Sequence, residues 1–200
     1  MATDEQVKAT RNTQSRARIK GALTELMREK GFDALTVSDL TRRAGVNRGT
    51  FYLHFVDKYD LLEQLETEII GQLEQALLAG DAPAGASCAE FFPYEKILSA
   101  LLIAKSDFAF VAAISGPGGD PEFSSKLKRI IEGLLDSGLA RAGTAVKTDA
   151  FPEAYARELA ISHVLSIIDL WLARGGKEAP EVVARMVVDA KDVCPSQLVG

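Results

Sequence analysis

The stretch TVSDLTRRAGVNRGTFYLHFVDKYDLL, residues 36–62, carries the strongest structural signal in the sequence. Thr36 can cap the start of a short helix, and Asp39, three positions later, can complete a capping box while complementing the helix dipole. Gly45 then occupies a position where a left-handed residue ends a helix at least cost, and Asn47 is a good cap for the next helix. Two short helices joined by a glycine turn are typical of a helix-turn-helix element.

The second of these helices has one apolar face and one face that suits a DNA groove. Phe51 and Phe55 lie one turn apart, so we expect both to point into the core. Gly49 and Leu53 then lie on the opposite face. Arg48 lies in the first helical turn, where recognition helices usually present side chains to base edges.

Tyr52 and His54 also have a simpler interpretation. An isolated tyrosine or histidine on a helix is more often part of a solvated surface, and Arg48 alone would be an ordinary surface charge. Together, in this order and beside two phenylalanines, these residues favour a DNA-contacting surface.

The segment from Ser15 to Leu65 resembles the DNA-binding domain of the TetR family of bacterial transcriptional repressors. The resemblance rests on three strings, AGV at residues 44–46, RGTFYLHF at 48–55 and DKYDLL at 57–62. Leu40-Thr41 replaces the usual Ile-Ala of the family, and Asn47 replaces the usual serine cap. Both substitutes are physically tolerable.

The resemblance implies separate sets of backbone and base contacts. Phosphate contacts are implied for Thr36, Tyr52, His54 and Lys58, and base contacts for Arg48, Gly49, Thr50 and Leu53. The complete predicted DNA-binding surface consists of Thr36, Arg43, Asn47, Arg48, Gly49, Thr50, Tyr52, Leu53, His54 and Lys58.

The composition is that of an ordinary globular protein, with 47% hydrophobic and 26% charged residues among 200. No apolar run approaches the length of a bilayer span, and no secretory leader is apparent. Cys88 and Cys194 lie far apart without metal-ligand spacing, which favours a reduced environment. We therefore expect a cytoplasmic protein without a metal or cofactor.

The net charge of −5 is unevenly distributed along the chain. Residues 1–56 contain ten Lys and Arg against six Asp and Glu, which gives +4, and the remainder contains thirteen against twenty-two, which gives −9. A basic head can meet phosphates while an acidic body is repelled by them, so the asymmetry favours one orientation on a duplex.

Hydrophobic periodicity predicts an all-α fold of about nine helices, without strands or internal repeats. The expected helices after residues 36–55 span about 57–79, two stretches between 94 and 115, 121–142, 152–174 and 180–191, and an earlier helix spans about 15–30. We expect a disordered basic tail at 1–12, a helix-turn-helix DNA-binding domain at 13–56, a helical ligand-binding and dimerisation domain at 57–191 and a C-terminal tail at 192–200. Residues 80–93 have the composition of a linker.

The segment LAISHVLSIIDLWL, residues 159–172, is apolar on nearly every face. Such a helix must be covered on both sides, by its own core and most simply by a second copy of the chain. We therefore predict a two-fold homodimer and an operator of two inverted half-sites. The predicted interface residues are Val164, Leu165, Ile168, Trp171 and Leu172, although a core position fits Trp171 equally well.

The C-terminal part of the sequence resembles, less specifically, the dihydroxyacetone-kinase-type regulators of the TetR family. The matching strings are ISGPGGDPEF at residues 114–123 and DLWLARGGKEAPEVVARM at 169–186. Some members of this subgroup work through protein partners or have no known inducer, which leaves a small-molecule pocket open to question. Candidate pocket residues are Phe91, Phe92, Phe108, Phe110 and Tyr155, although such residues more often belong to a core.

An enzymatic function has little support in the sequence. The two histidines, His54 and His163, stand alone, and no phosphate-binding glycine loop, metal cluster or nucleophile arrangement is present. Two hypotheses remain. The chain is either a repressor that responds to a signal through its helical body, or an interaction protein whose body binds another protein while DNA contact localises it.

Overall fold

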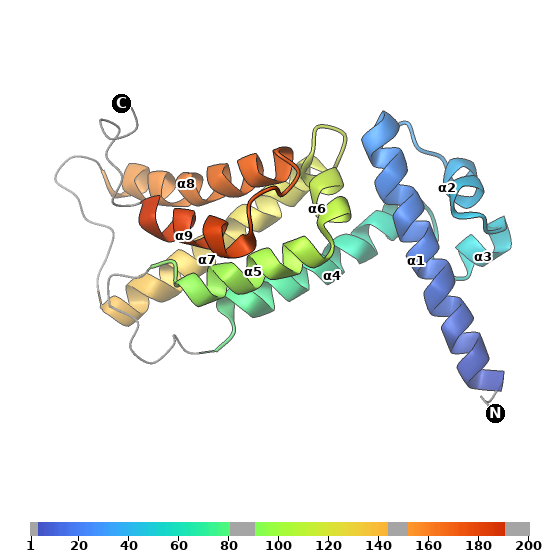
Figure 1. Cartoon of the computed structure of the whole chain (residues 1–200), viewed down its shortest axis with the longest axis horizontal. Coiled ribbons are helices and arrows are strands. Elements are labelled where there is room, and N and C mark those ends of the chain that lie inside the picture. Colours follow the sequence, from blue (N-terminus) through green and yellow to red (C-terminus); the bar gives the residue numbers. More distant parts are fainter. Residues whose placement is uncertain (1–3, 81–90, 144–151, 191–200) are drawn as a thin grey trace. The chain divides into compact units, whose positions relative to one another are not determined.

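The structure is a computed structural model that describes residues 4–80, 91–143 and 152–190. Within these ranges the chain forms nine helices and no strand, which confirms the predicted all-α fold. The helices are α1 (Asp4–Lys30), α2 (Val37–Ala44), α3 (Arg48–Tyr52), α4 (Lys58–Leu78), α5 (Tyr94–Ser106), α6 (Phe108–Ser115), α7 (Pro121–Ala142), α8 (Glu153–Ala173) and α9 (Pro180–Asp189) (Figure 1). Most of the predicted linker, the predicted tail at 192–200, Cys88 and Cys194 lie outside the described residues.

The helices form two compact units. The head unit consists of residues 1–69 and 109–123, and the body unit of residues 70–108 and 124–200. The head unit is therefore larger than the predicted helix-turn-helix domain at 13–56, because the first part of α4 and nearly all of α6 belong to it. Leu61 and Leu65 of α4 are buried, which makes this stretch part of the head core.

The core of the head unit begins with the apolar stripe of α1. Ile19, Leu23 and Met27 are buried, as their spacing predicts. α2 packs against α1 and α3 against α2, and Figure 1 shows both beside α1. α1 begins at Asp4 and not near Ser15. The prediction of a disordered tail at 1–12 is therefore wrong from Asp4 onward. The residues between Asp4 and Ser15 include no proline or glycine that would stop a helix.

The second segment of the head unit, residues 109–123, meets α1 where α1 ends. The Phe32 amide donates a hydrogen bond of 2.8 Å to the Gly118 carbonyl. A Cβ atom added to Gly118 would lie 2.9 Å from Gly31 Cα and 3.1 Å from Met27 O. The two backbones thus approach to a distance that leaves no space for a side chain. A second contact joins the same two segments, since the Lys20 ammonium of α1 lies 4.8 Å from the centre of the Phe110 ring of α6.

In the body unit, α9 packs against both α5 and α8. α8 ends at Ala173, close to the end at residue 174 that the sequence predicts. Gly175 and Gly176, which follow, both have positive φ. The Lys105 ammonium donates to the Gly176 carbonyl at 2.7 Å and thereby ties α5 to the turn between α8 and α9.

Trp171 belongs to the core of the body unit. It is 2% exposed, its indole N–H donates to the Glu178 carbonyl at 3.0 Å, and its ring meets Phe108 edge-on with centroids 5.4 Å apart. Val164 and Leu172 are buried as well. The predicted dimer interface is therefore corrected for these three residues, because their own chain already covers them. Leu165 and Ile168 are half-buried.

No single helix in the described part of the chain has both the length and the apolar character that crossing a membrane requires.

Candidate nucleic-acid interface

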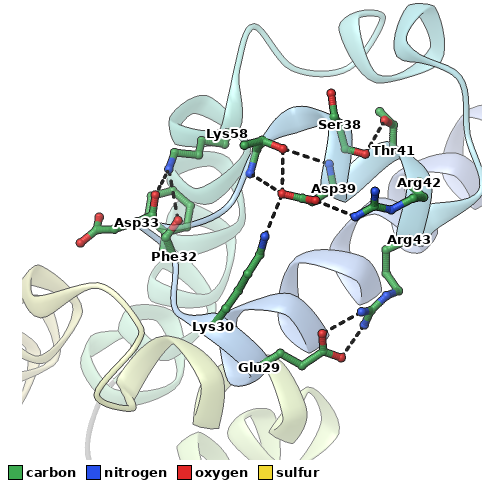
Figure 2. A network of polar contacts seen from close by, with 11 residues as sticks. Glu29, Lys30, Phe32, Asp33, Ser38, Asp39, Thr41, Arg42, Arg43 and Lys58 are labelled. Atoms are coloured by element: carbon green, nitrogen blue, oxygen red, sulfur yellow. Dashed lines mark hydrogen bonds and ion pairs between the residues drawn. The ribbon is translucent and has the colours of Figure 1, made fainter.

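The start of α2 is fixed by the predicted capping box, which the structure confirms. The Thr36 hydroxyl accepts a hydrogen bond from the Asp39 amide at 3.1 Å, and the Asp39 carboxylate accepts one from the Thr36 amide at 3.2 Å. Figure 2 shows that the Asp39 carboxylate also joins Lys30 and Arg42, each at 2.8 Å. The Lys30 ammonium, followed by the Thr36 hydroxyl, holds the pKa of Asp39 well below its usual range. This network fastens α2 to the end of α1.

The turn between α2 and α3 follows the expected glycine geometry. Gly45 has φ 61° and ψ 39°, a left-handed conformation that favours glycine. The Val46 amide donates to the Thr41 carbonyl at 3.0 Å. From α1, the Arg18 guanidinium donates to the Gly45 carbonyl at 2.9 Å and holds the turn in place.

α3 begins at the predicted cap but is shorter than expected. The Asn47 side chain accepts a hydrogen bond from the Thr50 amide at 2.7 Å. Phe51 and Phe55 are buried, as predicted. The helix nevertheless ends at Tyr52, because Leu53 is its C-cap and His54 lies in the turn that follows.

The outward face of this element is formed by residues that the sequence predicts to meet DNA. Arg48 and Gly49 are exposed, Tyr52 is 53% exposed and Leu53 is 81% exposed. Thr36 and Asn47 are exposed as well, while Thr50 and His54 are half-buried. Of the ten predicted residues, seven lie on α3 or directly beside its ends, and Thr36 is the N-cap of α2.

Arg43 is directed toward α1, as Figure 2 shows. Its guanidinium forms an ion pair with Glu29 at 2.7 Å, which Figure 2 shows, and another with Glu25 at 2.9 Å. The Glu29 carboxylate, followed by that of Glu25, raises the pKa of Arg43 above its usual value. Its predicted contact with DNA therefore competes with two intramolecular partners.

Lys58 is half-buried at the start of α4, and its ammonium contacts backbone carbonyls. It donates to the Phe32 carbonyl at 3.2 Å and to the Asp33 carbonyl at 2.9 Å, and it lies 4.9 Å from the centre of the Phe32 ring (Figure 2). Lys58 thus joins the start of α4 to the turn that follows α1.

Arg48 differs from the other cations of residues 36–58. Arg42, Arg43 and Lys58 each have an intramolecular partner. Arg48 forms no ion pair with any residue that the structure describes. Its exposed guanidinium therefore remains available to an external partner.

The residues proposed from sequence as a ligand pocket differ in burial and belong to both units. Phe110 belongs to the head unit, whereas Phe91, Phe92, Phe108 and Tyr155 belong to the body unit. Tyr155 is 67% exposed, and Phe108 packs against Trp171. Phe92 lies edge-on to His163, with ring centroids 5.7 Å apart. Phe91, Phe92 and Phe108 are half-buried, and a ligand pocket at these residues stays a prediction.

Three elements of the interface escaped prediction from sequence. They are the hydrogen bond from Arg18 to the turn, the ion pairs of Arg43 with α1, and the position of Asp39 between two cations. The spacing of Glu25 and Glu29 by four residues offered one signal, since it places two carboxylates on the same helix face. Within the described residues, no group of three or more His, Cys, Asp or Glu side chains is arranged to hold a metal ion.

Comparison with known proteins agrees with this geometry. Residues 20–65 match the family model of bacterial regulatory proteins of the tetR family. The chain is 27% identical over 189 residues to YxbF, an uncharacterized HTH-type transcriptional regulator of Bacillus subtilis, and the match covers 92% of this chain and 46% of YxbF. Over 64 residues it is 38% identical to YvdT of the same organism, covering 30% of this chain and 33% of YvdT. Each match thus covers less than half the length of the curated relative.

Solved structures share the fold across both units. A TetR transcriptional regulator from Streptococcus agalactiae has a TM-score of 0.61 at 21% identity, covering 94% of this chain and 98% of its own. The dihydroxyacetone kinase operon activator DhaS has a TM-score of 0.55 at 17% identity, covering 88% and 93%. At these identities the similarity concerns the fold alone. Residues 20–65 therefore match the DNA-binding domain of bacterial regulatory proteins of the tetR family, and the chain shares the fold of solved TetR regulators.

Proposed function

We propose that this protein is a cytoplasmic, sequence-specific transcriptional regulator without enzymatic activity, which represses transcription by occupying an operator as a homodimer. The observation that carries the proposal is the exposed Arg48 at the start of α3, which has no described intramolecular partner. An arginine at this point of a helix-turn-helix can form two hydrogen bonds with the O6 and N7 atoms of guanine. The neighbouring Tyr52 hydroxyl suits a phosphate oxygen.

The homodimer is proposed to form through an exposed apolar groove on α8 and α9. The groove has a volume of about 900 Å³. Leu170 of α8 is 60% exposed, and Val182 and Met186 of α9 are each 47% exposed. These three residues replace the buried ones in the interface prediction. The groove is lined by Ile167, Leu170, Glu181, Val182, Arg185, Met186, Asp189 and Ala190.

The charges along α9 suit a second, antiparallel copy of the helix. Glu181 and Asp189 lie four residues before and after Arg185, so all three lie along one face of the helix. In an antiparallel pair whose two-fold axis passes at the level of residue 183, each Arg185 would face Glu181 of the partner helix. A two-fold dimer of this kind would read an operator of two inverted half-sites.

The signal that controls DNA binding is proposed to act on the body unit. A small-molecule effector is one candidate, and the buried Nε2 atom of His163, which has no hydrogen-bond partner in the described residues, is a polar group that could bind it. The alternative is a protein partner, as the resemblance to the dihydroxyacetone-kinase-type subgroup suggests. A thermal shift caused by a specific small molecule would favour the first, and a partner that co-purifies in stoichiometric amount would favour the second.

Two arginine variants test the proposal. The operator is first selected from random duplexes with the full-length protein, and its position is then confirmed by footprinting on DNA that flanks the gene. Arg48→Ala should relax preference at one position in each half-site by about 1–3 kcal/mol. Arg43→Ala is the matched control, because its guanidinium is already neutralised by Glu25 and Glu29.

Base preference should persist in Arg43→Ala. If the wild-type protein selects no sequence even at low salt, or if Arg48→Ala retains the full base preference, the proposal is wrong.

A further inference from the structure

Among the side chains of the head unit whose burial the structure describes, the most exposed large apolar one lies at the end of the proposed recognition helix. Leu53 is 81% exposed and forms the C-cap of α3. Its backbone continues the helical path, with φ −72° and ψ −20°, and its amide donates to the Gly49 carbonyl at 3.1 Å. The position of Leu53 is therefore fixed one turn beyond Gly49.

Leu53 and Gly49 share the side of the helix opposite the core. Successive residues of an α-helix differ by about 100°, so Leu53 lies about 200° around the axis from the buried Phe51. Gly49 adds no side chain to this face. A Cβ atom there would meet only the Asn47 side chain, at 3.2 Å, so the space in front of Leu53 is open on the outer side.

The face formed by Gly49 and Leu53 has no side-chain hydrogen-bonding group. It can therefore recognise a base only through an apolar contact. In the major groove the C5-methyl group of thymine is the apolar feature that distinguishes base pairs. Arg48, five residues before Leu53, is exposed and available to bind DNA next to this face.

We infer that Leu53 packs against the C5-methyl group of one thymine in each half-site, so that the operator carries a thymine at a fixed distance from the base that Arg48 contacts. This inference rests on the proposed function. It makes Leu53 a residue that determines base specificity, and it requires a thymine methyl group in each half-site of the operator.

Removing the methyl group alone tests the inference. Each thymine of the selected operator is replaced in turn by deoxyuridine, which lacks only the C5-methyl group, and dissociation constants are measured by fluorescence anisotropy at constant salt. At one position per half-site the wild-type protein should bind about fourfold more weakly, the ratio expected when one methyl group is no longer buried. Uracil in both half-sites should weaken binding by about 15-fold.

Two variants identify the residue that contacts the methyl group. In Leu53→Ala the same uracil substitution should leave the dissociation constant unchanged, because the partner of the methyl group is already absent. Val56→Ala is the matched control, since Val56 is also strongly exposed, at 78%, but lies beyond the end of α3. It should retain the full uracil effect.

The possible results separate the inference from the proposed function. If no sequence is selected, the proposed function fails. If an operator is selected but uracil has no effect at any position, or has an equal effect on wild type and Leu53→Ala, the inference is overturned while the proposed function stands. If Leu53→Ala weakens binding to the thymine operator and to the uracil operator by the same factor, Leu53 contacts the sugar-phosphate backbone instead, and the inference is overturned.

Discussion

Gly118 is predicted to tolerate no side chain at the contact between the two segments of the head unit. In Gly118→Ala the added methyl group would lie 2.9 Å from Gly31 Cα and 3.1 Å from Met27 O. Both are backbone atoms and cannot rotate away as a flexible side chain would. The chain after α6 would have to move and weaken the hydrogen bond from the Phe32 amide. Overpacking and the weakened bond together should lower the free energy of unfolding by about 2–4 kcal/mol.

Gly21→Ala provides a control in which the same methyl group is added to the same unit. No atom lies within 4 Å of a Cβ at Gly21, which is in the interior of α1. This change should stabilise the protein by about 0.5–1 kcal/mol through helix propensity. Urea denaturation of both variants, followed by far-UV circular dichroism, measures the two effects. If Gly118→Ala unfolds at the same urea concentration as the wild type, the close approach to Gly31 does not exist in solution.

Two further predictions concern the hydrogen bonds and ion pairs of Asp39 and the proposed dimer. The pKa of Asp39 is lowered in the folded state, by Lys30 first and by Thr36 second, so its contribution to stability is present above the ordinary carboxyl pKa of about 3.9 and is lost as the pH falls through the lower folded value. Asp39→Asn should therefore be less stable than the wild type near neutral pH, and the gap should narrow on acidification in pH-dependent urea titrations; a gap that does not change with pH would contradict this assignment. For the dimer, Leu170→Asp combined with Met186→Asp should give monomers by sedimentation velocity, whereas Leu102→Asp, an exposed α5 position outside the groove, should leave the oligomer intact; a double variant that still sediments as a dimer would place the interface elsewhere.

Local sequence signals predicted the parts of the interface that depend on neighbouring residues. The capping box of Thr36 and Asp39 requires a spacing of three residues. The Asn47 cap requires a short side chain with an acceptor oxygen directly before a helix. The burial of Phe51 and Phe55 follows from one helical turn. In each case the interacting groups lie within four residues of one another, so the sequence contains the whole of the evidence.

The failures concern pairings between distant residues. Arg43 is occupied by carboxylates of α1 that precede it by 14 and 18 residues, and Lys58 by carbonyls 25 and 26 residues earlier. No local pattern contains these partners, because they depend on how α1, α2 and α4 pack. The same reason explains Trp171, since the ring of Phe108 that covers it comes from α6.

The division of the head unit into two stretches of sequence has a consequence for its synthesis. When residues 1–69 have left the ribosome, the DNA-reading helices exist but the piece that covers the end of α1 has not been translated. The unit becomes complete only after residue 123, when the whole of α5 has already been made. A chimeric regulator that takes its DNA-binding domain from this protein would therefore have to include residues 109–123, with Gly118 unchanged. These residues cover the end of α1 in the head unit.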